Sequence, residues 1–184
     1  MRIRCVHLQG SNEAMLKPTE VKSKAQRLEE QNYKFRTFLK NRADDDKLDA
    51  QFLALHKELF ADYDCCKCAN CCKAYNIILA GDEVKRISAF LGLTESDFIA
   101  EYLQNADADD EKPYKVREKP CSFLGGDGRC RIQNCKPDVC NEFPYTDKPG
   151  RLPRMYGVIK NAELCPVVFE ILERLKVMYG FGKA

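Results

Sequence analysis

The cysteines of this chain are concentrated in one part of the sequence. Ten of the eleven lie between Cys65 and Cys165, and five of these fall within the eight residues from Cys65 to Cys72. A globular core does not need thiols at this density, because a buried cysteine packs only as a small hydrophobic residue. The spacing C-x2-C-x2-C-C is followed by Cys121, Cys130, Cys135, Cys140 and Cys165. We therefore expect a fold whose loops gather thiolates around a soft metal.

The other potential ligands narrow the choice of metal. The two histidines, His7 and His56, both lie outside the cysteine-rich segment. A site built almost entirely from sulfur selects zinc, iron–sulfur clusters or Cu(I), and it disfavours Mg2+ and Ca2+. A histidine-activated cysteine nucleophile is also disfavoured, because neither histidine is near the thiols in sequence.

Two ligand arrangements remain open on spacing alone. A C-x2-C pair that closes with a distant pair predicts a tetrahedral zinc site, for which Cys65, Cys68, Cys121 and Cys130 are suitable. Three closely spaced thiols joined by a remote Cys-Pro, here Cys165-Pro166, are typical of bacterial ferredoxins. Cys71 and Cys72 are adjacent, and two neighbouring thiolates bridge two metals more easily than they bind one ion. This favours two centres or one polynuclear centre.

The periodicity predicts a mainly α fold with small irregular β elements. Apolar residues recur at helical spacing from Pro18 to Leu39 and again from Leu48 to Leu59, which predicts a helical hairpin over residues 18–62. Residues 1–17 are expected to form a flexible tail. Residues 63–184 are expected to form the cysteine-cluster domain, including a C-terminal helix that begins after Cys165, and the whole is expected to be one compact unit. Expected helix starts are Asp82, Thr94, Pro137 and Cys165, and a hairpin is expected between Cys121 and Cys130.

Charge and hydropathy bear on the partners. The formal net charge is +2, from 30 basic and 28 acidic residues, so a nucleic-acid partner is disfavoured. The partners expected from the cysteines are metal ions. No apolar stretch has the length of a membrane span or a secretory signal, which predicts a cytoplasmic protein without a membrane partner. In a reducing compartment, cysteines at this density indicate metal binding rather than disulfides.

The order of the motifs resembles a known family. Cys65-x-x-Cys68-Ala-Asn-Cys71-Cys72, Cys121-Ser-Phe-Leu, Cys130-Arg-Ile and Lys136-Pro-x-x-Cys140-x-x-Phe-Pro are similar to the YkgJ-type cysteine-cluster family of zinc- or iron-chelating domains, which is mostly bacterial. The resemblance implies that the metal ligands are Cys65, Cys68, Cys71, Cys72, Cys121, Cys130, Cys140 and Cys165.

The chain departs from this family pattern at four positions. Cys66 and Cys135 are additional thiols, Ala69 stands where glycine is usual, and Lys136 stands where arginine is usual. Lysine lacks the bidentate donor fork of arginine, so the change at Lys136 removes one way of clamping an anion. Phe123 and Phe143 are expected to pack around the centre.

Three functions are compatible with these observations. The first is a cytosolic protein that coordinates an iron–sulfur cluster or zinc through cysteine thiolates and that is redox-active in its iron form. The second is an enzyme, either an iron–sulfur oxidoreductase or a protein-modifying relative of flagellin lysine N-methylase, which contains a related cluster domain. The third is a zinc-ribbon-like nucleic-acid or protein adaptor. For the adaptor, a basic and aromatic face is expected from Arg129, Arg131, Lys136, Arg151, Arg154, Phe143, Tyr145 and Tyr156.

Overall fold

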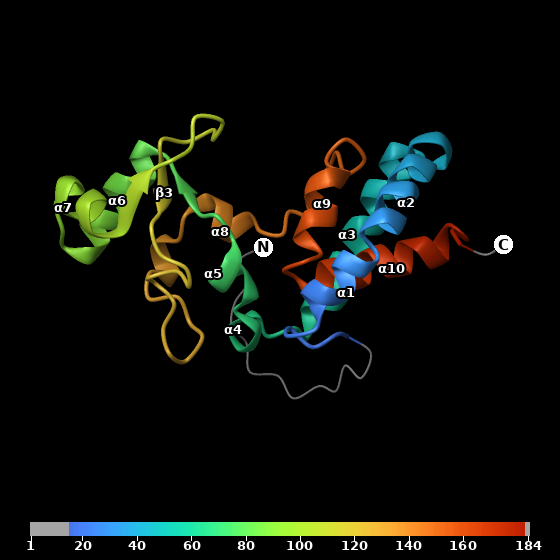
Figure 1. Cartoon of the computed structure of the whole chain (residues 1–184), viewed down its shortest axis with the longest axis horizontal. Helices are drawn as coiled ribbons and strands as arrows, with labels where there is room; N and C mark the ends of the chain where they lie inside the picture. Colours follow the sequence, from blue (N-terminus) through green and yellow to red (C-terminus); the bar gives the residue numbers. More distant parts are fainter. Residues whose placement is uncertain (1–14, 183–184) are drawn as a thin grey trace. The chain divides into compact units, whose positions relative to one another are not determined.

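The computed structural model describes residues 15–182, and it confirms the expected class, mainly α with a small sheet. These residues form two compact units, one of residues 65–143 and one of residues 15–64 together with 144–182 (Figure 1). In this division the C-terminal helix is grouped with residues 15–64, and the expected domain bounds of 18–62 and 63–184 stay a prediction. The expected tail, apart from residues 15–17, lies outside the described residues, as does Cys5. Within the described part of the chain, no helix combines the length and the apolarity needed to cross a bilayer.

The second unit is built from helices only. They are α1 (Val21–Arg27), α2 (Glu29–Arg42), α3 (Asp45–Ala61), α9 (Met155–Asn161) and α10 (Pro166–Met178). Helix α3 packs against α10 and α2 packs against α9, so the N-terminal helices find their main partners at the C-terminal end of the chain. Apolar side chains such as Phe35, Phe52 and Leu172 are buried between them. This apolar stripe explains why α10 belongs to the second unit.

Two helix starts in the second unit follow from local chemistry. The Asp44 carboxylate accepts a hydrogen bond from the Lys47 backbone amide at 2.9 Å and begins α3. Cys165 is the N-cap of α10 with Pro166 as its first residue, as expected. The single long helix expected from Pro18 is instead divided at Leu28 into α1 and α2.

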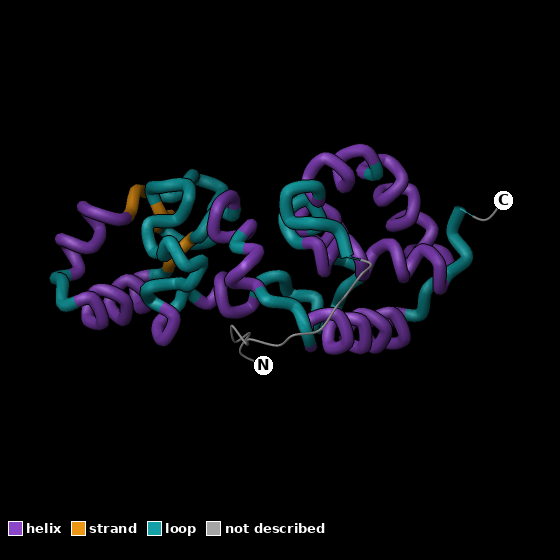
Figure 2. Tube along the Cα trace, turned by 90° about the horizontal axis from the view of Figure 1, so that it is seen from below, coloured by secondary structure: helices purple, strands orange, loops and turns teal. Residues whose placement is uncertain are grey.

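The first unit contains all the strands of the described chain, as Figure 2 shows. Its elements are α4 (Cys65–Cys68), α5 (Asn70–Ala74), β1 (Ile78–Leu79), α6 (Gly81–Leu91), α7 (Glu95–Tyr102), β2 (Leu103–Asn105), β3 (Tyr114–Val116), the 3-10 helix η1 (Gln133–Cys135) and α8 (Asp138–Glu142). The strands form an antiparallel sheet in the order β1-β3-β2, with Leu79 opposite Tyr114 and Leu103 opposite Val116.

The starts of α6 and α7 are determined by different residues. Thr94 caps α7 as expected, because its hydroxyl accepts a hydrogen bond from the Asp97 amide at 3.1 Å. The expected cap at Asp82 is wrong, since α6 already begins at Gly81. The Glu83 carboxylate instead accepts a hydrogen bond from the Ala80 amide at 2.7 Å, which is the glutamate half of a capping box.

Candidate metal centre

The cysteine-rich motif folds as two short helices separated by Ala69. Helix α4 carries Cys65 and Cys68, and α5 carries Cys71 and Cys72. Ala69 between them has φ of 50°, which is the left-handed conformation that alanine adopts only with strain. This residue ends one helical turn and starts another, so the thiols of α5 are not on a continuous helix with those of α4.

The expected hairpin between Cys121 and Cys130 is present and lies against both helices. Its two arms are paired at Leu124 and Cys130, and the Cys121 amide donates a hydrogen bond to the Cys72 carbonyl at 2.8 Å. At the turn, Gly128 has φ of 78°, and a Cβ at this position would lie 2.1 Å from the Cys66 carbonyl oxygen. Only glycine therefore allows the turn to approach the α4 backbone this closely.

Helix α8 brings a third part of the chain to the same place. Pro137 is its N-cap, Asp138 its first residue, and Cys140 lies within its single turn. The helix follows η1, whose Cys135 is buried. Helix α5, the hairpin and α8 thus bring together the segments around residues 71, 121–130 and 140.

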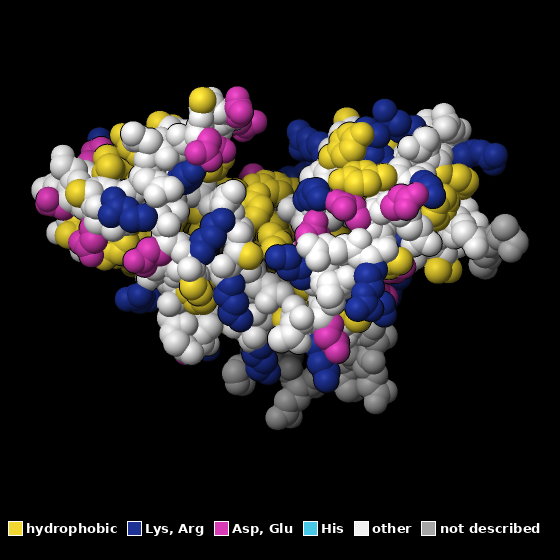
Figure 3. Space-filling view, in the orientation of Figure 1, with side chains coloured by type: hydrophobic (Ala, Val, Ile, Leu, Met, Phe, Trp, Pro, Cys, Tyr) yellow, Lys and Arg dark blue, Asp and Glu magenta, His cyan; other side chains and the backbone are white. Residues whose placement is uncertain are grey.

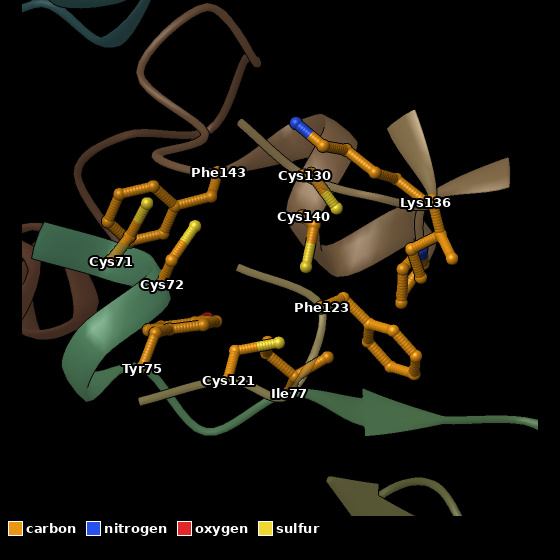
Figure 4. Close-up of a pocket in the computed structure, with 12 residues that line it drawn as sticks. Cys71, Cys72, Tyr75, Ile77, Cys121, Phe123, Cys130, Lys136, Cys140 and Phe143 are labelled. Atoms are coloured by element: carbon orange, nitrogen blue, oxygen red, sulfur yellow. The ribbon is translucent and has the colours of Figure 1, made fainter. Parts of the chain in front are cut away.

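These three segments enclose a cavity of about 60 Å³. Five cysteines line it: Cys71, Cys72, Cys121, Cys130 and Cys140. In Figure 4 the sulfurs of Cys72, Cys121, Cys130 and Cys140 point into a shared space. The thiols thus approach the cavity from different sides, as a polyhedral set of ligands requires.

The rest of the cavity wall is mostly apolar. Phe143 packs on Tyr75 with ring centroids 4.9 Å apart, and Phe123 stacks on Tyr102 at 5.1 Å. Phe123 and Phe143 line the cavity, which is the position expected for them from sequence. Lys136 is the one charged side chain in the lining, and its stem extends along the cavity in Figure 4. An apolar wall limits the access of water to a bound metal and strengthens electrostatic interactions inside.

The thiols influence one another electrostatically. Burial raises the pKa of Cys121 to about 11, and the proximity of Cys72 and Cys130 contributes to the rise although backbone amides oppose it. Burial, followed by the neighbouring Cys121, Cys72 and Cys130, also raises the pKa of Cys140. Thiolates in this cavity therefore repel one another, and a cation among them would replace this repulsion by attraction.

Cys72 differs from the other cavity thiols. A hydrogen bond from the Cys71 side chain, opposed by burial and assisted by the charges of Lys136 and Lys73, lowers the pKa of Cys72 to about 6. Cys72 is thus more readily deprotonated than Cys121, Cys130 and Cys140, and a thiolate is the form that binds metal.

The comparison with family models places the chain in a known group. Residues 64–166 match the model of the CxxCxxCC family, described as a putative zinc- or iron-chelating domain, and this match covers more than half of the 184 residues. The chain belongs to the CxxCxxCC family. This confirms the resemblance found in the sequence and indicates that residues 64–166 form a zinc- or iron-chelating domain. Comparison with curated proteins and with solved structures gave no match.

The structure places the eight ligands implied by the resemblance in three groups. Five of them line the cavity. Cys65 and Cys68 lie on α4 in the same unit as the cavity but are not part of its lining. Cys165 belongs to the second unit and is buried there.

The two additional cysteines are not part of the cavity lining. Cys66 is disulfide-bonded and so differs from the thiol expected at this position. Cys135 is buried, and burial raises its pKa. Within residues 15–182, no three Cys, His, Asp or Glu side chains already stand in a metal-coordinating arrangement. The fit of the CxxCxxCC cavity to zinc or iron therefore rests on its donors, which are sulfur atoms that both metals bind.

Several residues of this site were not expected there from the sequence. Tyr75, Ile77 and Ile132 line the cavity. Ile132 belongs to the motif Cys130-Arg-Ile, and the signal for Tyr75 and Ile77 is that each follows Cys72 within five residues. Arg151 was expected on a basic face, but it is buried and donates hydrogen bonds to the carbonyls of Tyr145 and Pro149. Phe143 was expected on the same face and is instead part of the cavity wall.

Proposed function

We propose that this chain is a thiolate metal protein in which zinc or an iron–sulfur cluster is held at the cavity by Cys72, Cys121, Cys130 and Cys140, with Cys71 beside them. The observation that carries the proposal is that five cysteines from three separated segments line one small apolar cavity. Bound zinc would supply cross-links between α5, the hairpin and α8, and an iron–sulfur cluster would supply one-electron redox chemistry as well.

The number of thiols supports a centre with more than one metal atom. A tetrahedral zinc ion needs four ligands, whereas five cysteines line the cavity and two of these are adjacent in sequence. A bridging thiolate uses such a pair without forcing both sulfurs onto one ion. Cys65 and Cys68, in the same unit, are the next candidate ligands, and Cys165 is a ligand on the basis of the resemblance alone.

Metal analysis of protein purified without oxygen tests the proposal. We expect more than one zinc or iron atom per chain, with visible absorption when the metal is iron. A colourless protein with one zinc per chain would overturn the polynuclear proposal, and a metal-free protein with unchanged stability would overturn metal binding altogether. Cys140→Ser should lower the metal content. Cys135→Ser is the matched control, because Cys135 is a buried thiol of the same unit that is not part of the cavity lining.

The cytoplasm remains the proposed location. The cavity cysteines are not joined in disulfides, which suits a reducing compartment, whereas Cys66 is disulfide-bonded. A comparison of metal content after purification with and without reductant, in wild type and in Cys66→Ser, tests whether this disulfide affects the centre.

The structure gives less support to the adaptor hypothesis. Arg151 and Phe143 are buried, so they cannot belong to an exposed basic and aromatic face. On the face seen in Figure 3, Lys and Arg side chains are interspersed with Asp and Glu on each unit. A mixed surface of this kind gives weak attraction for a phosphate backbone. We therefore propose metal binding without a nucleic-acid partner.

A further inference from the structure

Glu83 is a buried carboxylate that joins three parts of the first unit. Its side chain is 1% exposed. It accepts hydrogen bonds from the Ala80 amide, the Lys112 ammonium and the Asp138 amide, each at 2.7 Å. Burial acts to raise the pKa of Glu83, but these donors together hold it below its ordinary value. The carboxylate is therefore charged and fully engaged at neutral pH.

The bond from Asp138 connects Glu83 to the metal centre. Asp138 is the first residue of α8, and its amide is one of those that a helix cannot satisfy internally. Helix α8 has no side-chain cap of its own and is a single turn, which is too short to be stable in isolation. The helix therefore depends on Glu83 for its start, and two residues later it supplies the cavity thiol Cys140.

Arg86 holds the same turn from a second point. It lies three residues after Glu83 on α6, and such residues project from the same side of a helix. Its guanidinium donates a hydrogen bond to the Lys136 carbonyl at 3.1 Å and pairs with the Asp138 carboxylate at 3.3 Å. Glu83 and Arg86 thus bind the chain on both sides of Pro137, and Lys136 and Pro137 themselves line the cavity.

We propose that Glu83 is a positioning residue of the metal centre: it fixes the start of α8, so that the Cys140 sulfur faces the other cavity thiols and the affinity for metal is increased. This inference rests on the proposed metal-binding function. Glu83 does not contact the cavity, and it acts through the backbone of Asp138.

The test is the affinity of Glu83→Gln for Zn2+ and Co2+, measured by competition with a chelator under anaerobic conditions. We expect binding about 10- to 100-fold weaker than wild type, the range found when a group that orients a metal ligand is lost. We also expect the Co2+ complex to lose intensity in its thiolate-to-metal absorption, as we expect for Cys140→Ser. Retained affinity with an unchanged Co2+ spectrum would overturn the inference.

Asp97→Asn is the matched control. Asp97 occupies the equivalent position of α7 and interacts with the capping Thr94, but it is exposed and its helix carries no cysteine. We expect this variant to lose some stability of the metal-free protein and to keep wild-type metal affinity. Equal losses of affinity in both variants would mean that general destabilisation, rather than positioning, is the cause, and would overturn the inference.

The double variant Glu83→Gln/Cys140→Ser separates this inference from the proposed function. Because Glu83 acts through Cys140, its loss should have little further effect once Cys140 is absent. Additive effects would overturn the inference, whereas failure of the wild type to bind either ion would overturn the zinc form of the proposed function.

If Glu83→Gln does not fold, Arg86→Met provides the test. Arg86 is partly exposed, and its replacement leaves the buried carboxylate in place. A lower metal affinity in this variant supports positioning by α6, and an unchanged affinity contradicts it.

Discussion

Ala69 carries the clearest backbone strain in the cysteine motif. Its φ of 50° is needed to separate α4 from α5, and a Cβ in this conformation costs about 1–2 kcal/mol. We predict that Ala69→Gly raises the free energy of unfolding of the metal-free protein by about 0.5 kcal/mol, since the loss of one buried methyl group and the added chain entropy offset part of the relief. Chemical denaturation of the two proteins measures this difference.

Ala74→Gly is the control for Ala69→Gly, because Ala74 is the last residue of α5 and is exposed. There the same substitution should lower stability by about 0.5 kcal/mol, less than in a helix interior. If both variants lose stability, the strain at Ala69 does not account for the energetics of this turn.

His56 makes the second unit sensitive to pH. Its ring nitrogen Nδ1 lies 2.8 Å from the Thr146 hydroxyl, and both residues are buried. Burial lowers the pKa of His56, and the charge of Asp147 only partly opposes this. The unfolded chain, with a pKa of about 6.5, therefore binds a proton more readily than the folded chain does, so stability is highest above this pH and decreases as pH falls below it.

We predict that thermal stability of the second unit falls between about pH 7 and pH 5, by up to about 1.4 kcal/mol for each unit by which the pKa of His56 is lowered. His56→Gln keeps a hydrogen-bonding group for Thr146 but cannot be protonated, so its stability should be nearly constant over this range. Thermal unfolding at a series of pH values checks the prediction. The same slope in wild type and variant would show that His56 is not the titrating group.

At the scale of elements, the hairpin between Cys121 and Cys130 depends on its contact with α4. We predict that Gly128→Ala destabilises the first unit by at least about 2 kcal/mol, because the new Cβ would overlap the Cys66 carbonyl oxygen and Gly128 also has a positive φ. Displacement of the hairpin should also weaken metal binding, since the hairpin carries two of the cavity thiols. Denaturation and chelator competition measure the two effects.

Gly126→Ala is the matched control in the same turn. A Cβ at Gly126 meets no atom within 4 Å, so this variant should differ from wild type by less than about 0.5 kcal/mol. If Gly128→Ala and Gly126→Ala have the same free energy of unfolding, the close approach of Gly128 to α4 does not stabilise the position of the hairpin.

At the scale of the whole molecule, features that depend on neighbouring residues could be predicted from the sequence, whereas most contacts between distant elements could not. The start of α7 at Thr94 and the start of α10 after Cys165 were predictable, because a cap depends on neighbouring residues. The pairing of α2 with α9 and of α3 with α10 was not predictable. Apolar periodicity shows that a helix has a buried face, but it does not show which element covers that face.

The same limit applies to the candidate site. The density of cysteines predicted that thiols of several loops converge, and five of them line one cavity. The role of Glu83 could not be predicted, because its bond to Asp138 joins residues that are 55 positions apart. Glycine at position 128 was visible in the sequence, but its contact with the Cys66 backbone depends on how the hairpin docks.

The two units should respond differently to loss of metal. The first unit has short elements that meet around thiols, whereas the second has helices that bury side chains such as Phe35, Phe52 and Leu172. A metal that joins separate segments contributes its binding energy to their folding. We predict that chelation removes hydrogen-exchange protection from α5, the hairpin and α8, and leaves protection in α3 and α10. Exchange measured by mass spectrometry with and without a chelator checks this, and equal loss of protection in both units would show that their folding is coupled.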